Sequence, residues 1–225
     1  MGIFQKILVL VFSTLFIFST QFAIAQKKLK SGVVVYEITE VKTSIPELEL
    51  MKGVVTTIYF TPEKQKIDVN LNNESLKVQT FYNSRTQDVT VYYDFIGQRL
   101  KVSSNQKNSS IVKPYVNSIK YQKSVTKSIA GYQCYKTEIT FEDEKVVLWV
   151  TDRIKISNPD LQRLFPGLTS FPLEYVRRSK NAKMTFKAKY INELIDFDIF
   201  ETPSGYQEIS EKDFEERMGG MKFGF

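Results

Sequence analysis

The sequence has 225 residues, with 31 Lys and Arg against 25 Asp and Glu, and its formal net charge is +6. It contains no His and one Cys. These counts exclude an internal disulfide, Ser-His-Asp and Cys-His catalysis, and the usual His-containing zinc sites.

The first 25 residues have the pattern of a secretory leader. Lys6 precedes an apolar run from Ile7 to Phe18, and Ala23-Ile24-Ala25 supplies small residues before a cleavage point. The run is shorter than the roughly 18–20 residues that cross a bilayer, so an uncleaved anchor is the less favoured alternative. We expect a signal peptide at 1–25, cleaved after Ala25, and a single periplasmic domain at 26–225 that does not span the membrane. Gln26 stands where a lipid-anchored protein would need a Cys.

Beyond the leader, apolar residues alternate with polar ones, which is typical of half-buried strands. The alternation is clearest at 34–38, 67–71, 89–95, 100–102, 135–141, 146–150 and 184–190. Glu142-Asp143 and Ser179-Lys180-Asn181 are short enough to be tight turns between antiparallel neighbours. The spacing predicts a sheet of about nine strands without the strand-helix alternation of a nucleotide-binding fold.

Two short helices are expected. Asn158 is a candidate N-cap, and Pro159 follows it at the first helical position. Ser210 is a second candidate N-cap, with Asp213 at the third helical position. Ile209 and Phe214 would form a hydrophobic staple around the second cap, and Gly219-Gly220 would end that helix. Helices of this length cannot cover the sheet, which must close, pair with a second sheet, or hold another apolar molecule.

Residues with catalytic potential are few. Cys134 lies in an alternating segment without a His partner, which favours a buried structural thiol. Ser-x-x-Lys patterns at Ser104 and Ser124 lack the companion motifs of penicillin-binding enzymes. Asp196 and Asp198 would share one side of a strand, most simply as solvated carboxylates. No cofactor or metal is expected.

The segment from Arg177 to Tyr190 combines a basic face with an apolar one. Lys183, Lys187 and Lys189 alternate with apolar residues, and we hypothesise that they contact anionic lipid head groups. An ordinary solvated face, or a charged guard against edge pairing, is the alternative.

Four motifs in a fixed order resemble those of an uncharacterised group of envelope proteins. They are Gly131-Tyr132-Gln133-Cys134, the strand around Trp149, Phe165-Pro166-Gly167-Leu168, and Thr202-Pro203-Ser204-Gly205-Tyr206. The order is similar to that of the GLPGLI family and its domain-of-unknown-function relatives, although no glycine precedes Phe165. The resemblance implies a lipoprotein-carrier-like (LolA-like) fold. The expected fold class is therefore mainly β, a curved antiparallel half-barrel sheet with one or two short helices.

The leading functional hypothesis is a non-catalytic binder or carrier of an apolar ligand, such as an acyl chain, a lipid or a lipoprotein segment. Aromatic side chains would line its cavity: Tyr36, Tyr93, Phe95, Trp149, Phe186 and Tyr190. The alternative is a structural or assembly protein that binds an envelope protein partner through strand edges. An enzyme is the least favoured reading, and no nucleic acid partner is expected.

Overall fold

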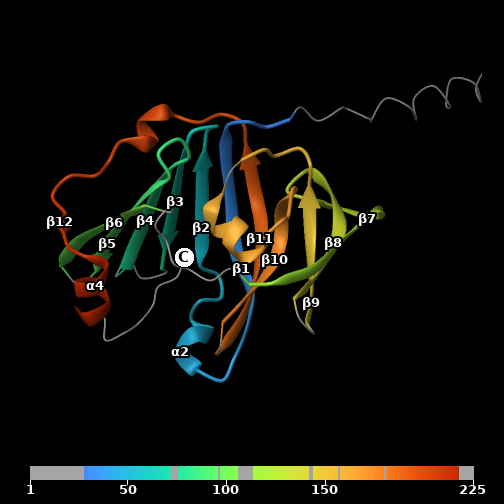
Figure 1. Cartoon of the computed structure of the whole chain (residues 1–225), viewed down its shortest axis with the longest axis horizontal. Helices are drawn as coiled ribbons and strands as arrows, with labels where there is room; N and C mark the ends of the chain where they lie inside the picture. Colours follow the sequence, from blue (N-terminus) through green and yellow to red (C-terminus); the bar gives the residue numbers. More distant parts are fainter. Residues whose placement is uncertain are drawn as a thin grey trace, which may run out of the picture.

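The computed structural model describes residues 28–71, 76–95, 97–105, 114–141, 144–156, 158–179 and 181–217. Within them the chain forms one curved sheet of twelve strands, in the order β12-β6-β5-β4-β3-β2-β1-β11-β10-β9-β8-β7 (Figure 1). The strands are β1 (Gly32–Thr43), β2 (Val55–Phe60), β3 (Lys64–Asn70), β4 (Leu76–Asn83), β5 (Asp88–Phe95), β6 (Gln98–Asn105), β7 (Val116–Ile129), β8 (Tyr132–Phe141), β9 (Glu144–Thr151), β10 (Phe171–Arg178), β11 (Ala182–Asn192) and β12 (Gln207–Glu208).

The sheet is mainly antiparallel and does not close. Neighbouring strands from β2 to β6 and from β7 to β11 are joined in chain order, and β1 pairs with both β2 and β11 at the centre. The two-residue β12 pairs in parallel with β6, whereas the other pairs of neighbouring strands are antiparallel. β7 and β12 form the two edges, so the predicted fold class, a curved and unclosed β sheet with few helices, is confirmed.

Register shifts change the alternation along the central pair of strands. Between β1 and β11 the register shifts at Val35/Tyr36 and again at Ile38/Glu40. Because a bulge places two residues opposite one, it transfers the next side chain to the other face of the sheet. The alternation of the sequence therefore predicts which face of the sheet a side chain is on only as far as the next register shift.

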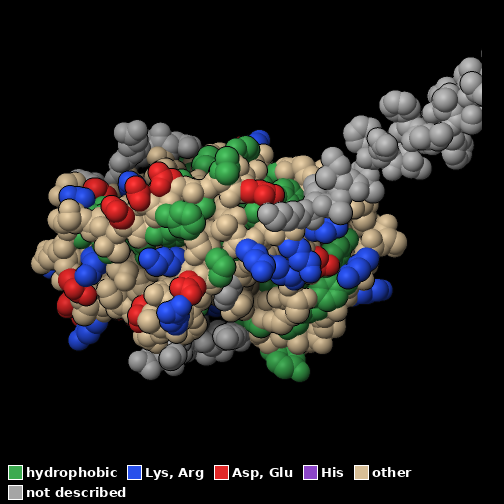
Figure 2. All heavy atoms as spheres, turned by 90° about the horizontal axis from the view of Figure 1, so that it is seen from above, with side chains coloured by type: hydrophobic (Ala, Val, Ile, Leu, Met, Phe, Trp, Pro, Cys, Tyr) green, Lys and Arg blue, Asp and Glu red, His purple; other side chains and the backbone are tan. Residues whose placement is uncertain are grey.

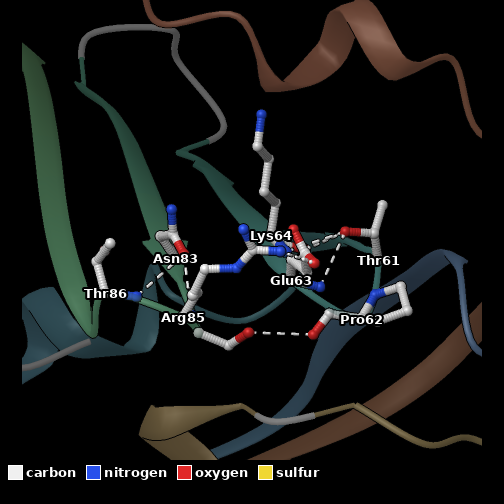
Figure 3. A network of polar contacts seen from close by, with 8 residues as sticks. Thr61, Pro62, Glu63, Lys64, Asn83, Arg85 and Thr86 are labelled. Atoms are coloured by element: carbon white, nitrogen blue, oxygen red, sulfur yellow. Dashed lines mark hydrogen bonds and ion pairs between the residues drawn. The ribbon is translucent and has the colours of Figure 1, made fainter.

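Turn chemistry holds the hairpins in register. Ala130 and Gly131, with φ of 48° and 82°, form the two-residue turn between β7 and β8, where both positions need positive φ. Figure 3 shows how the β2–β3 turn is tied to the β4–β5 turn. There Arg85 binds Glu63 at 2.5 Å, and the Ser84 hydroxyl donates to the carbonyl oxygen of Pro62 at 3.1 Å. These contacts link two hairpins at the end of the strands opposite to the β3–β4 connection.

The described helices are short: α2 (Pro46–Glu49), α3 (Pro159–Leu164), the 3₁₀ helix η2 (Phe197–Phe200) and α4 (Glu211–Arg217). The two expected helices are confirmed with their caps. Asn158 Oδ1 accepts from Leu161 N at 2.9 Å, and Ser210 Oγ accepts from Asp213 N at 3.0 Å. Helix α2, a single turn with Pro46 at its start, was not predicted from the sequence.

The face of the sheet against which α3 lies is called the inner face below. Phe214 of α4 stacks on Tyr93 of β5 with a centroid separation of 4.2 Å, so α4 covers one end of this face. α3 covers the region near β10, where Phe165 meets Tyr175 at 5.7 Å. Between these two helices, inner-face side chains of β2, β3 and β4 border a hollow.

One further expectation from the sequence is wrong, and several others concern residues outside the described part of the chain. Asp196 and Asp198 do not share a strand, because Asp196 caps η2 by accepting from Asp198 N at 3.1 Å. The leader with Ala25, the Glu142-Asp143 turn and Gly219-Gly220 all lie outside the described residues. Within the described part of the chain, no helix combines the length and apolarity needed to cross a membrane.

Candidate functional site

An apolar cavity of about 260 Å³ opens on the inner face between the central strands and the lip formed by α2. Its walls come from six strands, the helices α2 and α3, and residues of four connections. The lining residues are Ile38, Leu48, Met51, Thr56, Ile58, Ile67, Val69, Leu71, Leu76, Val78, Asn158, Asp160, Leu161, Tyr175, Arg177, Ser179, Ala182, Met184 and Phe186. Most of them are aliphatic, so the cavity can hold hydrocarbon without burying unpaired polar groups.

Stacked aromatic rings form one wall of the cavity. Tyr175 of β10 and Phe186 of β11 are paired in register and lie parallel, with centroids 5.1 Å apart and an interplanar angle of 4°. Behind them, Tyr36 meets Tyr175 edge to face at 5.8 Å and donates its hydroxyl to the Pro172 carbonyl oxygen at 2.6 Å. Burial raises the pKa of both tyrosines above the ordinary value, so their hydroxyls stay protonated. This wall is a packed layer of aromatic rings.

The opposite lip is built from the connection between β1 and β2. Leu48 and Met51 line the cavity, whereas Leu50 beside them is 76% exposed. The connection is fixed to β1, because Gly53 N donates to Ile38 O at 2.8 Å and Ile38 N donates to Val54 O at 3.0 Å. The lip therefore combines apolar side chains in the cavity wall with one that is exposed to solvent.

Charged groups meet the cavity at one corner, next to α3. We call this group, Asp160 with Arg163 and Arg177, the polar corner. Asp160 Oδ1 binds Arg163 Nη2 at 2.5 Å, and Asp160 Oδ2 lies 3.5 Å from Arg177 Nη1. Asp160 and Arg177 line the cavity, and their side chains are 19% and 23% exposed. The cavity thus has a long apolar part and one charged end.

Of the six aromatic residues expected to line a cavity, Phe186 lies in the wall. Tyr36 is 1% exposed and packs behind Tyr175, one layer further from the hollow. Tyr93 is on the inner face, but α4 covers it. Burial, with a smaller contribution from the negative charge of Glu211, raises the pKa of Tyr93 to about 12. Phe95 packs against the core in the same strand and does not line this cavity.

The other two aromatic residues face away from the cavity. Trp149 is paired with Glu174, which alternates with the cavity residue Tyr175, so Trp149 is on the outer face. Its ring lies 4.2 Å from Lys127 Nζ. Tyr190 follows the register shift opposite Val35/Tyr36, and it is 54% exposed. The bulge turns Tyr190 away from the face that Phe186 and Ala188 share.

The three lysines of the β10–β11 hairpin lie together on the outer face, as the alternation predicts. Each has an acidic neighbour: Lys183 with Glu144 at 3.8 Å, Lys187 with Glu174 at 3.8 Å, and Lys189 with Glu37 at 2.8 Å. Their side chains are 54%, 47% and 56% exposed. Contact of these lysines with anionic head groups stays a prediction. A head group would have to compete with the neighbouring carboxylates for the ammonium groups.

Sequence reasoning missed a second basic group, which comes from two distant segments. Leu29 bridges in parallel to Ile154, and its N donates to Arg153 O at 2.6 Å. This bridge brings Lys28 and Lys30 beside Arg153 and Lys155. Figure 2 shows Lys and Arg side chains gathered on the face seen from above. Nothing in the sequence signals a contact between residues more than a hundred positions apart.

Sequence reasoning also missed the aliphatic lining of the cavity. Ile67, Val69, Met184 and their neighbours were recognised as strand residues, but aromatic residues were chosen as the lining. Alternation assigns a side chain to a face, and it does not say which part of that face a helix covers. The polar corner gave no signal, because Asp160 and Arg177 meet only when α3 folds over β10.

Other clusters have structural roles. Cys134 is fully buried, as predicted, and burial raises the pKa of its thiol to about 12, so it is a poor nucleophile at neutral pH. Asp152 accepts from Tyr135 at 2.8 Å and from Ser170 at 2.6 Å, which ties β8 to the start of β10. Within the described residues, no three Cys, Asp or Glu side chains gather closely enough to hold a metal ion.

The fold and cavity define a mainly β protein with a curved sheet around a hydrophobic pocket. No family model matches the chain, and no curated protein matches it in sequence. Similar solved structures include PNGF-II, with a TM-score of 0.47 and 12% identity over 84% of this chain and 33% of that one. The chain therefore spans about a third of PNGF-II.

Two further solved structures are similar over most of their own length. The lipoprotein LppX of Mycobacterium tuberculosis gives a TM-score of 0.38 and 12% identity, over 76% of this chain and 90% of LppX. LprF of Mycobacterium bovis gives 0.36 and 12%, over 80% and 92%.

Proposed function

We propose that this chain is a non-catalytic binder or carrier of an apolar ligand, such as an acyl chain of a lipid or lipoprotein, in the bacterial envelope. The observation that carries the proposal is the apolar cavity of about 260 Å³ at the centre of the sheet. A folded chain gains stability by filling such space with its own side chains, so a preserved apolar hollow points to an external occupant.

Hydrocarbon is the ligand that these walls suit best. Burying one methylene group contributes about 0.8 kcal/mol, which corresponds to about a fourfold decrease in Kd. A series of straight-chain alcohols should therefore bind about fourfold more tightly per added methylene until the cavity is full. A series whose affinity does not change with chain length would contradict this filling.

The direct test narrows the cavity from one side. Met184 is half-buried and lines the cavity, so Met184→Trp should fill part of it and weaken binding of the neutral fluorescent probe N-phenyl-1-naphthylamine at least tenfold. Val147→Trp is the matched control, because Val147 is 41% exposed in β9 and does not line the cavity. Equal probe binding by the parent, Met184→Trp and the control would refute the proposal.

Location, partner and family complete the proposal. The leader pattern supports export to the periplasm with cleavage after Ala25, and the motif order supports the GLPGLI group as a sequence-level hypothesis. A lipid or lipoprotein is the proposed partner. Mass spectrometry of organic extracts of the protein, purified natively from the envelope, should find a co-purified acyl compound.

A second candidate is a structural or assembly protein of the envelope, and one observation favours it. β7 is a 14-residue edge strand, with Val125 43% exposed within it and Tyr115 74% exposed just before it. An extended segment of another protein could add to this edge. If the parent takes up the probe and Met184→Trp does not, the result supports the carrier function. Absence of uptake favours the second candidate.

A further inference from the structure

One border of the apolar cavity lies beside helix α4. Phe214 of α4 stacks on Tyr93 of β5, with ring centroids 4.2 Å apart. Tyr93 is the register partner of Val78 in β4, and Val78 lines the cavity. Register partners share a face of the sheet, and neighbouring strands are about 4.8 Å apart. Phe214 therefore covers the inner face one strand away from the cavity, and α4 ends three residues later at Arg217.

The sequence that follows α4 is long enough to cross the cavity. The strands that line it are β4, β3, β2, β1, β11 and β10, which are neighbours in the sheet in that order. Six strands at a spacing of about 4.8 Å extend over about 24 Å. The eight residues 218–225 lie outside the described residues. A chain of this length can extend over about 26–29 Å, so from the β4 border it can reach most of the lining.

The composition of these residues, called the 218–225 segment below, matches the lining. Met218, Met221, Phe223 and Phe225 are large and apolar, three of the other residues are Gly, and Lys222 carries the only charge. Burial of Met and Phe side chains is favourable, and the flexible Met side chain fits irregular gaps. The segment and the cavity are therefore complementary in polarity, and the end of α4 tethers one close to the other.

We propose that the 218–225 segment occupies the apolar cavity when no ligand is present, and that a ligand binds by displacing it. This inference rests on the proposed function and adds regulation of the same site. Both occupants are apolar, so they compete for the same side chains of the lining. The segment keeps its own Met and Phe side chains and those of the lining out of water until a ligand arrives.

Competition by a tethered segment weakens the apparent affinity for a ligand without changing the number of sites. A short flexible tether gives an effective concentration on the order of 1 mM. The apparent Kd of the ligand equals the intrinsic Kd divided by the fraction of molecules whose cavity is free. A segment that is bound in about 80–90% of the molecules therefore raises the apparent Kd about five- to tenfold.

The first test weakens the segment within the full-length chain. Phe223→Ser combined with Phe225→Ser should lower the Kd of N-phenyl-1-naphthylamine about fivefold or more, with unchanged stoichiometry. The matched control combines Leu194→Ser with Phe197→Ser, because these side chains are 81% and 68% exposed and do not line the cavity. The control also removes two large apolar side chains, and it should bind the probe as the parent does.

The second test supplies the segment as a separate molecule. A synthetic peptide with the sequence of residues 218–225 should displace the probe from the double variant, with half displacement at a concentration on the order of 1 mM or below. The same peptide with Ser in place of both Phe residues should leave the probe bound. Because both peptides are added to the same protein, this result does not depend on a difference in stability between variants.

Each outcome decides a separate point. Equal or weaker probe binding by the double variant than by the parent would overturn the role of the segment and leave the apolar cavity in place. A peptide that does not compete would overturn it as well. A gain in affinity that appears only at high protein concentration would assign the contact to the segment of a second copy. Absence of probe binding by both the parent and the double variant would instead remove the proposed function.

Discussion

Replacing Phe186 by Ala tests the aromatic wall and the cavity together. Phe186 is 8% exposed and stacks on Tyr175 at 5.1 Å. Removing a core Phe ring costs about 3–5 kcal/mol of unfolding free energy. One side of this ring already borders the cavity, where it has no protein atoms to lose, so we expect the lower end, about 3 kcal/mol. The loss includes the stacked pair, which contributes about 0.5–1.5 kcal/mol.

The measurement is urea unfolding followed by the fluorescence of Trp149, the single tryptophan of the chain. The m-value should stay constant, because the surface exposed on unfolding hardly changes. Phe197→Ala is the matched control, since Phe197 is 68% exposed and the same change there should cost less than about 0.5 kcal/mol. A cost for Phe186→Ala below about 1 kcal/mol, or equal to the control, would refute the packing described for this wall.

Two further predictions concern Cys134 and the lysines. Cys134→Ala should lower the unfolding free energy by about 1–3 kcal/mol at pH 7, and the native thiol should react with a bulky reagent only in denaturant; rapid native labelling would contradict its burial. Burial raises the pKa of this thiol from 9.0 to about 12, so the folded state holds the proton more tightly than the unfolded chain. The thiol's contribution to the free energy of unfolding is full below about pH 9 and is lost as the pH rises toward 12. The unfolding free energy of the parent should therefore fall more steeply between these two pH values than that of Cys134→Ala. Changing Lys183, Lys187 and Lys189 together to Gln should alter the free energy of unfolding by less than about 1 kcal/mol and should weaken the salt-dependent sedimentation of the protein with anionic vesicles. The comparison variant changes Lys28, Lys30 and Lys155 to Gln. If the first variant sediments with the vesicles as the parent does, the lysines of the hairpin do not bind anionic head groups.

The strand content, both helix caps and the burial of Cys134 could be predicted from local sequence. Alternation along 67–71 and 146–150 assigns each side chain to a face because strand geometry repeats every two residues. Asn158 and Ser210 reveal helix starts because their side chains bind backbone N–H groups two or three residues on. These interactions are completed within a few residues, so the sequence alone contains them.

The cavity and its polar corner depend on contacts between distant residues. Tyr190 belongs to the predicted apolar face by alternation, yet the bulge opposite Val35/Tyr36 turns it outward. Tyr93 is on the inner face, but whether it lines a cavity depends on α4 folding back over β5. Asp160 meets Arg177 only through the packing of α3 on β10. Local interactions along the chain account for the strands and the starts of the helices, so these features can be read from the residues involved. The open part of the inner face and the charges that meet there depend instead on how distant segments cover the sheet, so they require the folded structure.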